Sequence, residues 1–234
     1  MQPELMAHRG NSGLAPENTL AAFAKAIETK SKWVELDVHL TADGEVVVMH
    51  DAKVDRTTNG TGAIADLTFA QIRALDAGSW FGPEFAGEKV PTLAEVVDLL
   101  RGRLRINVEI KSAADPESSR KVVEILRKGG VLEQSMISSF GLQAVLEVRK
   151  YWDDPMLALI TGKIEDLQTT IDNGLQYFNI EYHPVDGALI EKAHAAGVGV
   201  NVWTVDDPAL WPHFAKLGAD ILTSNQPHLM PVEG

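Results

Sequence analysis

Acidic side chains stand at alternate positions in two short apolar segments of the chain. Segment 33–38 carries Glu35 and Asp37, and segment 105–110 carries Glu109. Successive side chains of a strand point to opposite faces, so the acids of a strand share one face and the aliphatic residues share the other. Burying an unpaired carboxylate costs several kcal/mol, and a divalent cation relieves that cost. An all-oxygen ligand set favours Mg²⁺ or Ca²⁺ over Zn²⁺.

Cationic residues near these acids leave a second interpretation open. Ion pairs of Glu35 with Lys111 and of Glu109 with Arg9 would neutralise two of the three carboxylates without a metal. The same two cations also suit a phosphate group, because a guanidinium matches phosphate geometry and an ammonium adds a point charge. The charged residues therefore point to a metal site, to an anion site, or to both together.

Two histidines accompany these groups in the chain. His8 directly precedes Arg9 at the end of an apolar segment, and His50 follows another such segment. Imidazole titrates near neutral pH, so both side chains are candidates for passing protons to and from oxygen atoms. A lone histidine more often satisfies a local hydrogen bond. The combination with acids and cations is what indicates acid–base chemistry on an anionic substrate.

Eight short apolar segments, which alternate with helical patterns, must position these residues. They are residues 5–8, 33–38, 105–110, 135–140, 156–160, 177–181, 199–204 and 220–223. From residue 135 onward, successive segments begin 21 or 22 residues apart, which is a βα repeat length. Eight such units predict an α/β fold, a (β/α)₈ TIM barrel, whose active site lies at the carboxyl ends of the strands.

The interval between the second and third segments is longer than one repeat. Asp43-Gly44 within it is typical of a hairpin turn, and a hairpin symmetric about that turn would place His50 opposite Glu35. Residues 51–90 are predicted to form an insertion, between strand 2 and helix 2, over one end of the barrel. No linker marks a second domain, so residues 1–234 are predicted to form one domain.

The composition of the chain excludes several classes of protein. Its 234 residues carry a formal charge of −12, which disfavours a nucleic-acid partner. The chain has no cysteine, so disulfides, thiolate catalysis and sulfur-ligated metals are excluded. It has no apolar run long enough to cross a membrane, no signal-peptide pattern at its start and no basic amphipathic segment. These features predict a soluble, cytoplasmic protein without stable membrane association.

The order and spacing of nine short motifs resemble those of the glycerophosphodiester phosphodiesterase family. The motifs are His8-Arg-Gly10, Ala15-Pro-Glu-Asn18-Thr19, Glu35-Leu-Asp37, Thr41-Ala-Asp-Gly44, His50-Asp51, Leu75-Asp-Ala-Gly-Ser-Trp80-Phe81, Val90-Pro-Thr-Leu-Ala-Glu95, Asn107-Val-Glu-Ile-Lys111 and Val202-Trp-Thr-Val205. The resemblance runs from residue 6 to about residue 227. It implies a TIM barrel that splits glycerophosphodiesters into sn-glycerol 3-phosphate and an alcohol, a small-molecule reaction.

The resemblance also implies roles for particular residues. One divalent cation, Mg²⁺ or Ca²⁺ with Mn²⁺ also possible, would be bound by the three acids, Glu35, Asp37 and Glu109. General base and general acid would be His8 and His50. The residues that bind substrate would be Arg9 and Lys111 at the phosphate, Asn18 near them, and Trp203 at the glycerol end. Our hypothesis is that His8 activates the nucleophile and that His50 protonates the leaving group.

One departure and two alternatives accompany this resemblance. The family often ends strand 8 with Thr-Asp-x-Pro, whereas segment 223–227 here reads Thr-Ser-Asn-Gln-Pro, a position to which we assign no chemistry. An alternative substrate is a lysophospholipid, whose acyl tail would need an apolar groove, formed by Trp80, Phe81, Phe140 and Trp203. Another alternative is a non-catalytic barrel that binds a ligand. The sequence leaves open the headgroup, the metal and the oligomeric state. It also leaves open whether water attacks the phosphorus directly or a cyclic phosphate forms first.

Overall fold

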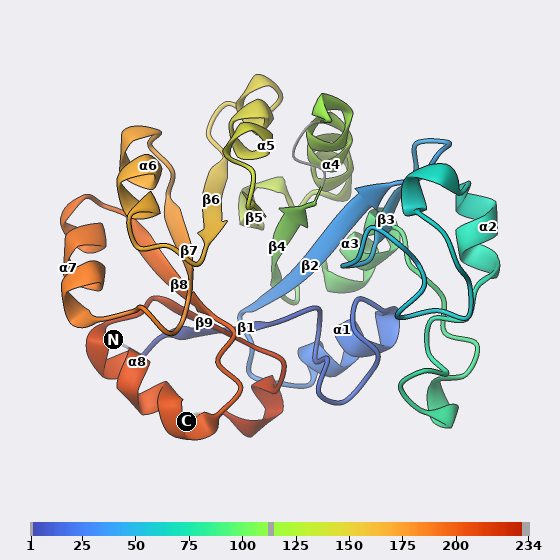
Figure 1. The fold of residues 1–234 in the computed structure, drawn as a ribbon, viewed down its shortest axis with the longest axis horizontal. Helices are drawn as coiled ribbons and strands as arrows, with labels where there is room; N and C mark the ends of the chain where they lie inside the picture. The colour runs from blue at the N-terminus through green and yellow to red at the C-terminus, as the bar shows by residue number, and fades with distance from the viewer. Residues whose placement is uncertain (1, 112–114, 231–234) are drawn as a thin grey trace.

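A closed barrel of parallel strands forms the centre of the computed structural model, which describes residues 2–111 and 115–230 (Figure 1). Eight strands pair in parallel around the ring in the order β1, β2, β4, β5, β6, β7, β8 and β9, and β9 returns to β1. The strands are β1 (Glu4–Ala7), β2 (Trp33–Leu40), β3 (Val46–Val48), β4 (Arg105–Ile110), β5 (Ser135–Ser139), β6 (Met156–Thr161), β7 (Tyr177–Glu181), β8 (Gly199–Trp203) and β9 (Ile221–Ser224). The predicted TIM barrel is therefore confirmed.

Helices surround the ring of strands. They are α1 (Leu20–Ile27), α2 (Phe69–Ala74), α3 (Leu93–Leu100), α4 (Pro116–Gly129), α5 (Leu142–Glu147), α6 (Asp166–Asp172), α7 (Gly187–Ala195) and α8 (Trp211–Leu217). Thr92 and Glu95 form a capping box at the start of α3, and Asp115 caps α4 ahead of Pro116. None of the helices within the described part of the chain has both the length and the apolar character needed to span a membrane.

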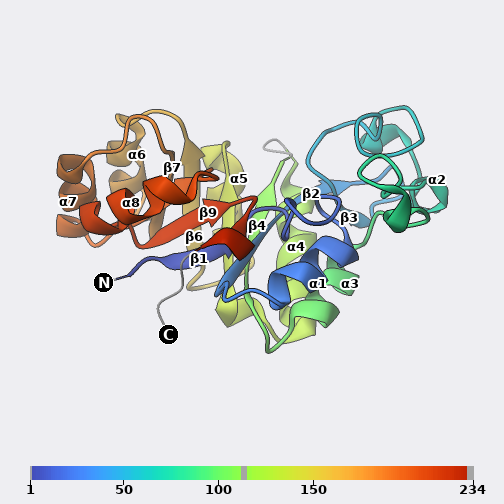
Figure 2. The same cartoon turned by 90° about the horizontal axis from the view of Figure 1, so that it is seen from below.

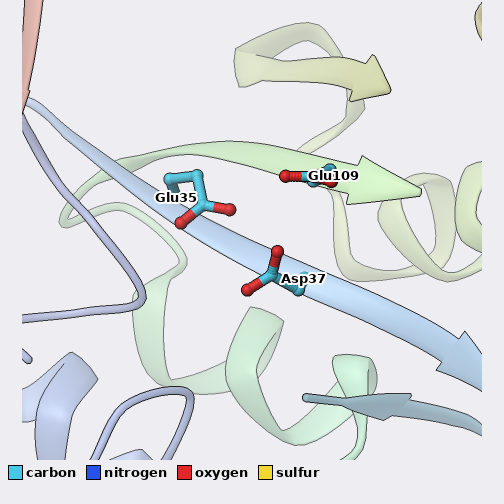
Figure 3. Close-up of side chains that lie close together, drawn as sticks. All are labelled: Glu35, Asp37 and Glu109. Atoms are coloured by element: carbon cyan, nitrogen blue, oxygen red, sulfur yellow. The ribbon is translucent and has the colours of Figure 1, made fainter. Parts of the chain in front are cut away.

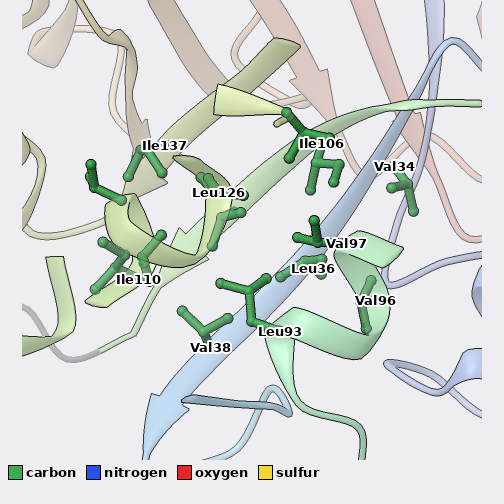
Figure 4. Packing of buried hydrophobic residues seen from close by; sticks show 14 of the residues in the cluster. Val34, Leu36, Val38, Leu93, Val96, Val97, Ile106, Ile110, Leu126 and Ile137 are labelled. Atoms are coloured by element: carbon green, nitrogen blue, oxygen red, sulfur yellow. The ribbon is translucent and has the colours of Figure 1, made fainter. Parts of the chain in front are cut away.

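The aliphatic faces of the strands pack outward against these helices, as Figure 4 shows for β2 and β4. Residues of β2, β4 and β5 meet residues of α3 and α4 in one buried cluster, which includes Val34, Leu36, Val38, Leu93, Val96, Val97, Ile106, Ile110, Leu126 and Ile137. Burial of a large aliphatic side chain stabilises the fold by about 1.5–3 kcal/mol. Because side chains alternate along a strand, this outward packing directs Glu35, Asp37 and Glu109 into the barrel.

The interior of the barrel changes from apolar to polar along its axis. Its amino-terminal end is filled by a buried cluster of Met6, Trp33, Met136, Ala158 and Ile221. Above this cluster, two buried hydrogen-bonded pairs cross neighbouring strands. They are Ser138 to Asn107 at 2.8 Å and Thr223 to Asn201 at 2.8 Å. The apolar end excludes water from below, so polar chemistry is confined to the carboxyl ends of the strands.

The antiparallel strand β3 lies beside β2, but its register differs from the prediction by one residue. Val38 pairs with Val48 and Leu40 with Val46, so the same register would place Leu36, not Glu35, opposite His50. The expectation that His50 lies opposite Glu35 is therefore wrong. The turn contains one residue more than a symmetric Asp-Gly turn, because the loop is closed by a hydrogen bond from the Thr41 amide to the Glu45 carbonyl.

Residues 51–90 lie between β3 and α3 and contain α2 and two short 3₁₀ helices, residues 64–66 and 83–85. This insertion stands on the opposite side of the barrel from α7 (Figures 1 and 2). A separate buried cluster holds it to β3, formed by Val47, Met49, Val54, Ile64, Ile72, Ala77 and Val90. The packing fixes the loop that carries His50 to the barrel rim.

Candidate active site

A pocket at the carboxyl ends of the strands brings together most of the predicted site residues. Seven of the nine line it, namely His8, Arg9, Glu35, His50, Glu109, Lys111 and Trp203. The other two, Asn18 and Asp37, do not line the pocket and lie behind the residues that do. The Asn18 side-chain amide donates a hydrogen bond to Asp37 Oδ2 at 2.7 Å, and both side chains are buried. The nine predicted residues therefore form one cluster.

Three carboxylates form the centre of this cluster, and Figure 3 shows them facing one another from β2 and β4. Glu35, Asp37 and Glu109 are buried, and one ligand oxygen from each lies within 4.8 Å of the others. The strand register explains the geometry, since Asp37 pairs directly with Glu109 across β2 and β4. Glu35 and Asp37 are two positions apart on β2, so their side chains point to the same face, and Glu35 therefore lies beside Asp37 and Glu109.

Two cations approach the carboxylates, in a pattern that differs from the expected pairs. Lys111 Nζ lies 2.7 Å from Glu109 Oε1 and 3.0 Å from Asp37 Oδ1. The Arg9 guanidinium lies 3.5 Å from Asp37 Oδ2. The expected pairs Glu35–Lys111 and Glu109–Arg9 are not among the ion pairs of the described residues. Both cations instead contact Asp37, and Lys111 contacts Glu109 as well.

The pKa values of the three acids separate as a result. Although burial opposes the charged form of Asp37, Lys111 and Arg9 outweigh it and lower its pKa to about 2. Burial and the charge on Asp37 raise the pKa of Glu109 to about 7. Burial and the two neighbouring acids raise the pKa of Glu35 well above its ordinary value. The cluster thus needs more positive charge than Lys111 and Arg9 supply.

This cluster fits a divalent cation. Glu35 Oε1 is buried and has no hydrogen-bond partner among the described residues, although the other oxygen of Glu35 accepts the Arg9 backbone N–H at 2.9 Å. An orphaned, buried carboxylate oxygen is costly unless a cation contacts it. The donor set contains only oxygen, which suits Mg²⁺, Ca²⁺ or Mn²⁺. Glu35, Asp37 and Glu109 are thus compatible with one divalent metal ion.

His8 is held at the end of β1 by a neutral partner. Its Nδ1 lies 2.7 Å from Asn225 Oδ1, and its Nε2 faces Glu35 Oε2 at 3.8 Å. Burial, followed by the positive charge on Arg9, lowers the pKa of His8 to about 4. His8 is therefore neutral at neutral pH, with one ring nitrogen directed toward the acidic cluster.

His50 is held by a charged partner instead. Its Nδ1 lies 2.7 Å from Asp51 Oδ1, and Arg56 of the insertion donates to both oxygens of Asp51 at 2.7 and 3.0 Å. The same guanidinium donates to both oxygens of Glu17 at 2.8 and 2.9 Å, and Glu17 accepts from Arg9 at 2.8 Å. Arg56 thus links the support of His50 to the support of Arg9.

Two residues of the site adopt a left-handed backbone conformation. Arg9 has a φ of 54° and Asn18 a φ of 59°, which is uncommon outside glycine. At Arg9 this conformation directs the backbone N–H to Glu35. Such strained positions often occur at functional sites, where surrounding contacts stabilise them.

Aromatic side chains form one wall of the pocket. The Phe140 and Trp203 rings meet edge to face with centroids 5.8 Å apart, and Phe140 is 55% exposed. Trp80 and Phe81 do not line this pocket, so the groove of four aromatic residues that an acyl tail would need does not form there. Phe81 instead meets Trp80 and Phe85 edge to face within the insertion.

The structure adds residues that the sequence did not identify as functional. They are Glu17, Asp51 and Arg56 on the His50 side and Asn225 and Asp206 on the His8 side. Glu17 and Asp51 stand inside quoted motifs, which was a usable signal, whereas Arg56 and Asp206 carried none. Asn225 lies in the segment 223–227 to which no chemistry was assigned.

Comparisons with known proteins agree with this geometry. The model of the glycerophosphoryl diester phosphodiesterase family matches residues 8–229. A glycerophosphodiester phosphodiesterase of Caldanaerobacter subterraneus subsp. tengcongensis is 36% identical over 98% of this chain and 97% of its own. One of Bacillus subtilis is 31% identical over 96% of this chain and 84% of its own.

Solved structures show the same likeness. A phosphodiesterase of Oleispira antarctica, determined in complex with the product sn-glycerol-3-phosphate, superposes with a TM-score of 0.91 at 31% identity. The superposition covers 97% of this chain and 94% of that one. With a family match over nearly its whole length and relatives above 30% identity, the chain belongs to the glycerophosphoryl diester phosphodiesterase family.

Proposed function

We propose that this protein hydrolyses glycerophosphodiesters to sn-glycerol 3-phosphate and an alcohol. One observation carries the proposal, namely that a buried oxygen-only acidic cluster and two differently supported histidines face one pocket. Family membership and the product complex of the Oleispira antarctica relative support the same reaction class. A non-catalytic binding barrel would not require all of these groups in one place.

The charged residues suit a phosphodiester monoanion. We assign one divalent cation, Mg²⁺, Ca²⁺ or Mn²⁺, to Glu35, Asp37 and Glu109. When bound, it supplies charge neutralisation and Lewis-acid polarisation at a phosphoryl oxygen. Arg9 and Lys111 line the same pocket and bind the phosphate, because their charges stabilise the negative charge that grows in the transition state.

The two histidines divide the proton transfers. His8 is neutral at neutral pH and directs Nε2 toward the acidic cluster, which suits a general base that takes a proton from the attacking hydroxyl. His50 Nδ1 contacts the Asp51 carboxylate, which fixes the orientation of the ring, and we assign His50 as the general acid for the leaving alkoxide. Trp203, beside Phe140, provides an apolar wall for the glycerol end of the substrate.

The direct test is release of sn-glycerol 3-phosphate from glycerophosphocholine by the purified protein. We expect release that EDTA abolishes, that Mg²⁺, Ca²⁺ or Mn²⁺ restores, and that the His50→Ala variant lacks. Glycerophosphoethanolamine and a lysophospholipid are assayed in parallel, the latter by release of lysophosphatidic acid, because its acyl chain stays on the glycerol. Cleavage of the lysophospholipid alone would favour that alternative substrate. No cleavage of any of the three with any metal would favour the binding-module alternative.

A further inference from the structure

Asn225, the residue after β9, contacts His8 through its side-chain amide. Asn225 Oδ1 lies 2.7 Å from His8 Nδ1 and accepts a hydrogen bond from Ser12 Oγ at 2.8 Å. An amide oxygen can only accept, so the ring nitrogen that meets it must carry the proton. The direction of the Asn225 amide therefore decides which nitrogen of neutral His8 is protonated.

Asp206, in the loop after β8, fixes the direction of that amide. One of its oxygens accepts the Asn225 side-chain Nδ2–H at 2.7 Å. The other accepts the Asn225 backbone N–H at 2.7 Å and the Ser224 hydroxyl at 3.0 Å. A carboxylate only accepts, so it selects the NH₂ side of the Asn225 amide and turns the carbonyl oxygen toward His8. The opposite orientation of the amide would place two oxygens against each other.

We propose that Asp206 is a positioning residue that acts on His8 through Asn225. It holds neutral His8 as the tautomer protonated on Nδ1, which leaves a lone pair on Nε2, the nitrogen that faces the acidic cluster. A general base needs this free lone pair. The catalytic consequence rests on the base role of His8 proposed above, whereas the tautomer itself does not. Neither Asp206 nor Asn225 lines the pocket.

An exchange of the two side chains tests this assignment. In Asp206→Asn, two NH₂ groups face each other, so Asn225 turns its NH₂ toward His8 and favours the other tautomer. In Asn225→Asp, two carboxylates face each other and repel. The double variant with both changes restores a matched pair, because the amide at position 206 donates to the carboxylate at position 225, which again accepts from His8. The chain offers Asp207→Asn as a matched control, since the Asp207 carboxylate accepts the nearby Ala209 backbone N–H and does not reach Asn225.

Two measurements follow the exchange. For the kinetics, we expect each single variant to lower kcat by about 10²- to 10⁴-fold, the usual contribution of a general base, with little change in KM. The double variant should recover to within about tenfold of the wild-type kcat, and Asp207→Asn should match the wild type. Thermal unfolding of all four variants shows whether each is folded.

The tautomer is read directly by long-range ¹H–¹⁵N correlation of the histidine rings, with Mg²⁺ present at a pH of about 8, where imidazole is neutral. The His8 signals are assigned by their loss in His8→Gln. We expect Nδ1–H in the wild type and the double variant and Nε2–H in Asp206→Asn. An Asp206→Asn variant that keeps Nδ1–H and wild-type kcat would overturn the proposal, as would a double variant no better than either single one. If the wild type releases no product, the proposed function fails, and the ring signals still decide the role of Asp206.

Discussion

His8 and His50 face the same pocket, but two different regions of the molecule support them. His8 directly follows barrel strand β1 and meets the neutral amide of Asn225, whereas His50 follows the hairpin and meets the carboxylate of Asp51. The Asn225 amide adds no charge beside the His8 ring, whereas the Asp51 carboxylate places a negative charge beside the His50 ring. The two histidines thus meet unequal environments, and unequal environments are what separate acid and base roles in other enzymes.

The two supports also differ in their dependence on the insertion. The His8 support joins the ends of β1, β8 and β9, so it belongs to the barrel itself. The His50 support passes through Arg56, which lies in the insertion and is 44% exposed on its side chain. The barrel therefore fixes the proposed base, and the insertion completes the site around the proposed acid.

The largest expected effect comes from removing each histidine in turn. His8→Ala and His50→Ala should each lower kcat by about 10²- to 10⁴-fold on glycerophosphocholine, because each loses one proton transfer. A substrate with an acidic leaving group, such as a nitrophenyl diester, needs no general acid. It should restore the rate of His50→Ala and not that of His8→Ala, as measured by kcat on both substrates.

The reverse pattern would contradict the comparison between the two supports. Restoration in His8→Ala alone would make His8 the acid, despite its neutral partner. Restoration in neither variant would show that both histidines act before the leaving group departs.

A smaller effect is expected from Asp51→Asn, which leaves a hydrogen bond to His50 but removes the charge. A hydrogen bond to a charged group contributes about 1.5–3 kcal/mol, which corresponds to a fall in kcat of about 10- to 100-fold. On the nitrophenyl substrate, which needs no general acid, kcat should fall much less. Asp55→Asn is the matched control, because Asp55 lies in the same insertion and accepts the Gly62 backbone N–H, away from His50. An equal loss on both substrates would indicate damage to the fold.

Strand alternation explains why the centre of the site was predictable. Glu35, Asp37 and Glu109 stand within strands, and a strand's period of two residues fixes which side chains enter the barrel once the aliphatic face is known. The βα spacing then places all eight strand ends around one pocket. The fold and the clustering of the three acids both depend on local patterns, so both could be inferred from a single sequence.

The residues that support the two histidines could not be predicted, because their contacts do not follow a local pattern. Asn225 is 217 residues from His8, and Arg56 is 39 residues from Glu17. These contacts join loops, which have no fixed period, so no spacing rule connects them. The predicted register of β3 was wrong for a similar reason, because one additional turn residue shifts every pairing after it. Loop geometry decides both.

Replacing Arg56 by Gln should have a modest effect on the His50 side. Asp51 still contacts His50, so the variant loses only the clamp that joins Asp51 to Glu17. Partly exposed ion pairs contribute about 0.2–1 kcal/mol each, so two such pairs predict a fall in kcat of about two- to 30-fold. Arg73→Gln, which breaks the pair with Glu95 in the same part of the chain, should leave kcat unchanged. Equal losses in the two variants would show that Arg56 merely stabilises the insertion.

The smallest expected effect is that of Ser12→Ala on the His8 side. Ser12 donates to Asn225 Oδ1, but His8 donates to the same oxygen, and Asp206 still fixes the amide. A neutral hydrogen bond contributes about 0.5–1.5 kcal/mol, and because its acceptor keeps another donor, the lower end applies, about twofold in kcat. The ring signals of His8 should still report Nδ1–H. A loss as large as that of Asp206→Asn would mean that the hydroxyl, rather than the carboxylate, orients the amide, and the barrel side of the comparison would then depend on the loop after β1.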